Sequence, residues 1–195
     1  MIRVLIMLEN IILTIGLIII LMLLDYFLTL KGLKAYKKSY SKFVEFESYE
    51  LNPIVKESIS KGVYNLKHLL SMVLVSLLVY VVHYLSFNNL FGFQIGTFFF
   101  TQGMIFSMGV YMNSRHIQNL IIFNWVDKDP SMLSGKIKQK NIFSLKALIA
   151  QSIGLFLILI FIFIFVQNMF TLGFSLGPLI VLLKTRSWIK TTIFH

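Results

Sequence analysis

An apolar stretch over residues 11–30 is the feature that most constrains how this chain can fold. It is twenty residues long, contains one ionisable residue, Asp25, and is followed at once by Lys31 and Lys34. A helix of about 20 apolar residues is what crosses a hydrocarbon layer about 30 Å thick. We therefore expect a first membrane span here. No cleavage site of small residues follows, so we expect this span to be retained and not removed as a signal peptide.

The rest of the chain repeats the pattern. Of its 195 residues, 57% are apolar and 13% are charged, whereas soluble domains carry about 25% charged residues. Four further apolar runs predict spans at about 69–86, 95–113, 145–166 and 173–184. The fold class that follows is an all-α integral membrane helical bundle of about five transmembrane helices, forming a single domain over residues 1–195. We expect a multipass protein of the cell membrane.

The last run is short and contains Gly173, Gly177 and Pro178. These residues leave two alternatives: a tilted, kinked crossing or a segment that re-enters the membrane without crossing it. The cations after it, at Lys184, Arg186 and Lys190, favour a full crossing that ends in the cytoplasm. In the third run, Gly103 and Ser107 form a small-xxx-small pair that permits close helix contact, so this helix is expected to be central.

The distribution of cations predicts the orientation. With five crossings, seventeen of the eighteen Lys and Arg residues fall on one side of the membrane. Positive residues accumulate in cytoplasmic loops, so we expect the N-terminus outside, the C-terminus inside and amphipathic cytoplasmic segments at 31–67 and 114–144. Topology accounts for the net charge of +10, so we expect no nucleic-acid partner. Anionic lipid head groups are the expected partners of these segments, and five helices make a thin pathway, so we also expect a homo-oligomer or larger membrane complex.

Unusual polar residues gather at the predicted cytoplasmic boundary, and this is the main functional signal. The candidate binding or pathway residues are Asp25, Glu50, Asn52, Arg115, His116, Asn119 and Gln151. A carboxylate inside a span is costly and is usually paired or functional, which makes Asp25 the first candidate. Arg115, Gln118 and Asn119 share one helix face, with His116 about 100° away.

Each candidate also has a structural explanation. Asp25 could form an ion pair with Arg115. Asn52 before Pro53 is a helix-start signal that needs no ligand, because asparagine caps and proline suits the first helical position. A single histidine at a membrane interface, such as His116, commonly only forms hydrogen bonds. Gln151 is expected to bridge helices.

A short pattern near the start of the chain resembles a known family. Asp25 and Thr29 stand at the end of the first predicted span, and Glu50-Leu51-Asn52-Pro53 follows it. This arrangement resembles that of a family of small, uncharacterised prokaryotic multipass membrane proteins with an Asp/Thr pair and a Glu-x-Asn-Pro motif. The resemblance covers about the first third of the chain and implies no activity.

Three functional interpretations follow from the sequence. The first is transport or channel-type movement of an ion or small solute through a cytoplasm-facing polar pocket. The second is a membrane assembly or lipid-interaction protein that acts through its basic segments. The third is an intramembrane hydrolase or lipid-modifying enzyme in which Asp25, Glu50 and His116 would bind a metal. The chain lacks the HExxH and GxSxG motifs and has no cysteine, so no catalytic signature or cofactor is indicated.

Overall fold

The computed structural model describes residues 10–52, 56–61 and 66–193, and its architecture is an all-α bundle. The five long helices are α2 (Ile11–Lys38), α4 (Leu66–Phe87), α5 (Ile95–Lys128), α6 (Asn141–Val166) and α7 (Met169–Ile193). All five are long and apolar enough to cross a membrane. Their length and composition identify a multipass membrane protein, which confirms the fold class predicted from the sequence.

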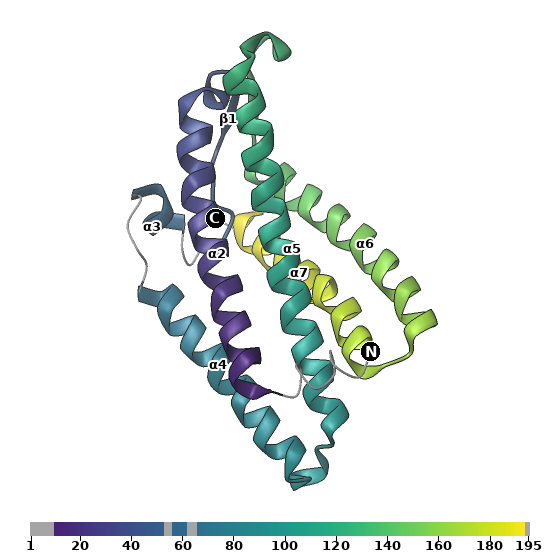
Figure 1. Cartoon of the computed structure of the whole chain (residues 1–195). Helices are drawn as coiled ribbons and strands as arrows, with labels where there is room; N and C mark the ends of the chain where they lie inside the picture. The colour runs from purple at the N-terminus through teal and green to yellow at the C-terminus, as the bar shows by residue number, and fades with distance from the viewer. Residues whose placement is uncertain (1–9, 53–55, 62–65, 194–195) are drawn as a thin grey trace.

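Helix α5 is central, as its small residues predicted. It packs against α2, α4 and α7, while α6 packs mainly against α7 (Figure 1). The contact between α5 and α7 depends on glycine, because a Cβ atom on Gly173 would overlap the backbone carbonyl of Phe100. Gly177 likewise lies against the side chain of Ser107. Small residues at these positions let the two backbones approach closely.

Several helices are longer than the apolar runs predicted; α5, for example, continues from the predicted span at 95–113 to Lys128. α2 continues to Lys38 because no glycine pair or proline interrupts residues 31–38, and cations in its last turn complement the helix dipole. α7 begins at Met169, where the side chain of Asn168 accepts a hydrogen bond from the backbone N–H of Thr171 (2.8 Å). It runs through Pro178 to Ile193 as a single helix long enough to cross a membrane. Packing against α5 holds this helix together where its glycines and proline suggested a shorter element.

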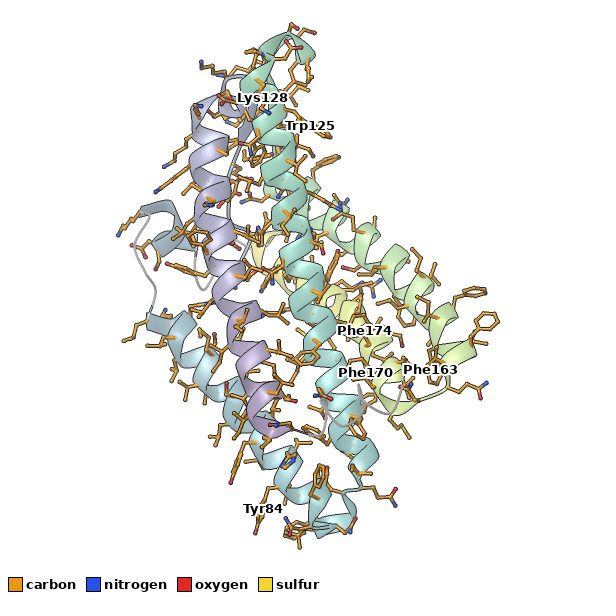
Figure 2. All side chains as sticks on the ribbon, viewed as in Figure 1. Tyr84, Trp125, Lys128, Phe163, Phe170 and Phe174 are labelled. Atoms are coloured by element: carbon orange, nitrogen blue, oxygen red, sulfur yellow. The ribbon has the colours of Figure 1, made fainter. Side chains whose placement is uncertain are left out.

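A pair of three-residue strands joins the two segments predicted to be cytoplasmic. β1 (Val44–Phe46) and β2 (Ile137–Gln139) are parallel, with Val44 opposite Ile137. Lys38 also forms an ion pair with Asp127 (2.5 Å) at this end. The two segments therefore lie at the same end of the bundle, which carries Trp125 and Lys128, while Tyr84 lies at the opposite end (Figure 2). We call the end that carries Trp125 and Lys128 the basic end.

Helical structure resumes after β1 within the described residues. The structure contains a short helix α3 (Lys56–Lys61) and then α4 from Leu66. The predicted helix start at Pro53 lies outside the described residues.

Tyr36 attaches β1 to helix α2. Its hydroxyl group is buried, donates to the carbonyl of Val44 (3.1 Å) and accepts from the backbone N–H of Phe46 (3.0 Å). We expect Tyr36→Phe to lower the free energy of unfolding by about 1–2 kcal/mol, because it leaves two buried backbone groups without partners. Chemical denaturation in detergent measures this change. Tyr80→Phe, at a side chain that is 51% exposed, is the matched control and should leave the free energy of unfolding unchanged. Equal losses of stability in both variants would contradict the role of Tyr36 in attaching β1 to α2.

Candidate functional site

One cavity of about 340 Å³ lies among α2, α5 and α7, beside α4 and the loop at residues 49–52. Its lining changes along the helices. On α5 the lining runs from Ile105 and Met108 to Arg115, His116 and Asn119. α2 and α7 show the same order, from apolar residues such as Ile18 and Val181 to polar residues such as Asp25 and Lys184. The cavity therefore has an apolar half and a polar half, and the polar half faces the basic end.

Asp25, Thr29 and His116 form the centre of the polar half. The hydroxyl of Thr29 donates to the backbone carbonyl of Asp25 one turn earlier (2.8 Å) and lies 3.2 Å from Nε2 of His116. A threonine hydroxyl has one proton, which Thr29 donates to the carbonyl of Asp25, so we assign Nε2 of His116 as the donor in the second contact. Nε2 also lies 3.2 Å from Oδ1 of Asp25. The carboxylate of α2 and the imidazole of α5 are thus held together by the threonine.

Three atoms in this half are buried without a hydrogen-bond partner among the described residues. They are Oδ1 of Asp25, Nδ1 of His116 and the hydroxyl of Tyr49. The contact of Oδ1 with His116 has ion-pair distance but lacks the alignment of a hydrogen bond. Buried polar atoms of native proteins are nearly always paired, and those that are not call for an explanation such as a bound molecule. All three residues line the cavity.

Glu50 enters the polar half from the loop after β1. Its carboxylate accepts a hydrogen bond from the backbone N–H of Asn52 (2.7 Å). Burial raises the pKa of Glu50 above its ordinary value, an effect partly offset by the Asn52 hydrogen bond and by electrostatic interactions with His116 and Arg115. Glu50 and Asp25 both line the cavity. Four of the residues predicted to gather at one boundary, Asp25, Glu50, Arg115 and His116, line this one cavity.

The raised pKa of Glu50 predicts a pH dependence of stability. A carboxyl group with a raised folded-state pKa binds its proton more tightly in the folded protein, so the free energy of unfolding falls as pH rises above the ordinary value of 4.5. We expect Glu50→Gln to flatten this fall, as measured by denaturation in detergent at a series of pH values. Glu45→Gln, at an exposed strand position, serves as the control and should keep the wild-type profile. A Glu50→Gln variant that keeps the full slope would contradict the assignment.

Arg115 and Gln151 form a bridge between helices. Nε of Arg115 donates to Oε1 of Gln151 on α6 (3.1 Å). The suggested ion pair between Asp25 and Arg115 is not formed, because Arg115 turns toward α6 while His116 turns toward α2. Asn119 lines the cavity, whereas Gln151 and the exposed Gln118 do not.

Asn52 lines the cavity as well, and its predicted role as the cap of a helix at Pro53 lies outside the described residues. Further polar and aromatic lining residues that sequence reasoning missed include Tyr49, His68, Lys184 and Trp188. His68 lies 3.1 Å from the backbone carbonyl of Met22 through Nε2. An aromatic residue directly before the Glu-x-Asn-Pro pattern was the available signal for Tyr49.

The metal-site interpretation finds no geometric support. Asp25 and His116 come together, but no group of three His, Asp or Glu side chains within the described residues is arranged to hold a metal ion. Glu50 lies near this pair without completing such a group.

Comparison with known proteins yields no match to any family model, any curated protein or any solved structure.

Proposed function

We propose that the protein moves an ion or small solute across the membrane, and that Asp25 and His116 form the proton-exchanging pair of its binding pocket. The observation that carries this proposal is the acid–base pair inside the cavity, contributed by two helices long and apolar enough to cross the membrane. A carboxylate and an imidazole at such depth are costly, and in membrane proteins such groups mark ion pathways and proton relays.

Buried side chains separate the cavity from the end of the bundle opposite the basic end. A protein that moves a solute by alternating access has a state that is closed on one side in this way. There, Gln102 donates to the hydroxyl of Thr14 (2.7 Å), and both side chains are buried. Ile18 and Phe98 belong to the apolar cluster beside this hydrogen bond, and each is at most 1% exposed. A solute in the cavity would meet this cluster before it reached the other side of the membrane. We therefore infer that the structure represents the state open toward the basic end.

Proton flux in proteoliposomes tests the proposal. The purified protein is reconstituted with a pH-sensitive dye inside, and a potassium diffusion potential is imposed with valinomycin. We expect a faster rate of proton movement than in protein-free liposomes, and we expect this increase to depend on Asp25. Flux equal to that of protein-free liposomes, together with no uptake from a panel of small solutes, would overturn the proposal.

A second candidate is lipid interaction through the basic end. Lys31, Lys34, Lys37, Lys38 and Lys42 are all exposed, and pairing of β1 with β2 brings exposed Lys136, Lys138 and Lys140 to the same end. Cations near an anionic leaflet contribute about 1 kcal/mol each, which supports head-group binding there. In this role the protein would act as an assembly or lipid-interaction factor, as a homo-oligomer or within a larger complex.

Charge reversal of Lys31, Lys34 and Lys37 to Glu tests this second role. We expect the triple variant to lose most of its preference for phosphatidylserine-containing nanodiscs in a competition assay, while its thermal stability is retained. An unchanged lipid preference would count against the second candidate.

A further inference from the structure

The cavity is divided in a way that specifies the chemistry of its ligand. Its apolar half is continuous with its polar half, so an occupant that fills it must be apolar at one end. A hydrated inorganic ion would lose its water shell against Ile105, Met108 and Leu148 without replacement contacts. A volume of about 340 Å³ lies at the lower end of the range typical of small-molecule sites. The cavity therefore fits a small amphiphile.

The charges around the polar half disfavour a charged head group of either sign. Arg115 and the exposed Lys184 would repel a cation, and the carboxylate of Asp25 would repel an anion. Arg115 already donates through Nε to Gln151. A neutral head group that both donates and accepts hydrogen bonds is repelled by none of these charges.

The unpaired atoms define what that head must supply. Oδ1 of Asp25 is an acceptor, and Nδ1 of His116 is an acceptor in the neutral tautomer that carries its proton on Nε2. The Tyr49 hydroxyl can donate or accept. Burial and the neighbouring Glu50 raise the pKa of Tyr49, so its proton is kept at neutral pH. A hydroxyl group matches this set, since its hydrogen can pair with an acceptor and its oxygen can accept from Tyr49.

We propose that the ligand of this pocket is an amphiphilic alcohol, with its hydroxyl head among Asp25, His116 and Tyr49 and its chain against Ile105, Met108 and Leu148. This inference rests on the proposed role of the cavity as the solute-binding pocket. It narrows the solute from an ion or small molecule to a neutral, hydroxyl-bearing amphiphile.

Trp188 provides the readout, because it lines the cavity and the chain has only two tryptophans. The other, Trp125, lies near the far end of α5 and is 57% exposed (Figure 2). In a Trp125→Phe protein held in nanodiscs, quenching of Trp188 by a medium-chain alcohol brominated near its hydroxyl group reports occupancy. The acid and the amine with the same chain and bromine position are the matched probes. We expect saturable quenching by the alcohol, and affinities at least fivefold weaker for the acid and the amine.

Tyr49→Phe should weaken binding of the alcohol about fivefold, the loss expected for one hydrogen bond. Tyr80→Phe, on the exposed surface of α4, should leave the affinity unchanged. Non-saturable quenching that is equal for all three probes, tighter binding of the acid or amine, or full affinity in Tyr49→Phe would each overturn the inference.

The two proposals fail separately. Saturable binding of the alcohol without any flux in liposomes would overturn transport and leave the ligand assignment standing. Asp25-dependent flux without binding of the alcohol would overturn the ligand assignment and leave transport standing.

Discussion

Replacement of Asp25 by asparagine is expected to reduce flux through the protein at least tenfold. Asparagine has nearly the same shape but cannot carry the negative charge that faces Nε2 of His116 at 3.2 Å. Asparagine also cannot bind and release a proton, so the pair can no longer exchange a proton with the pocket. Proton flux in proteoliposomes under an imposed potential measures this loss.

Asp127→Asn is the matched control for this experiment. Asp127 also lies on a long helix and also has a cationic partner, Lys38, but this pair stands at the basic end away from the cavity. The control should retain wild-type flux. If Asp25→Asn folds normally and transports as well as the wild type, Asp25 has no part in the mechanism.

Gly173→Ala is expected to cause the largest loss of stability among single methyl additions. The new Cβ atom would overlap the carbonyl group of Phe100, which belongs to the backbone of α5 and cannot move aside as a flexible side chain could. We expect the free energy of unfolding to fall by about 2 kcal/mol, within the range seen for overpacked sites. Thermal denaturation in detergent measures the change.

Gly16→Ala and Gly154→Ala separate this packing effect from the effect of alanine itself. Nothing lies within 4 Å of the added Cβ atom at either position, and alanine favours a helix over glycine by about 1 kcal/mol. Both controls should therefore be neutral or slightly stabilised. A Gly173→Ala protein as stable as these two would show that α5 and α7 do not approach as closely as described.

The spans could be predicted from the sequence because hydropathy over about 20 residues responds to the bilayer itself. The ends of the helices could not, since they depend on local contacts. Residues 31–38 were predicted as an interfacial segment, yet they continue α2. The segment around Pro178 left a kinked crossing and a re-entrant segment open, and the structure places Pro178 inside one long helix, α7. The β1–β2 pair was missed because three residues in each of two distant segments leave no alternating pattern.

The candidate site was predictable as a set of residues but not as a set of contacts. Positive-residue asymmetry placed Asp25, Glu50, Arg115 and His116 at one boundary, and all four line one cavity. Which of Arg115 and His116 meets Asp25 depends on the rotation of α5 against α2, because adjacent helical residues point about 100° apart. That rotation follows from packing, which a single sequence does not reveal.

The most direct test of the account is the accessibility of the pocket from each side of the membrane. The chain has no cysteine, so a single Asn119→Cys substitution can be labelled with a membrane-impermeant maleimide in vesicles of known orientation. Asn88→Cys, an exposed position in the turn after α4 at the opposite end, is the reference. We predict that Asn119→Cys reacts only from the cytoplasmic side and Asn88→Cys only from the outer side. Labelling of both from the same side, or no labelling of Asn119→Cys from either, would contradict a water-accessible pocket that faces the cytoplasm.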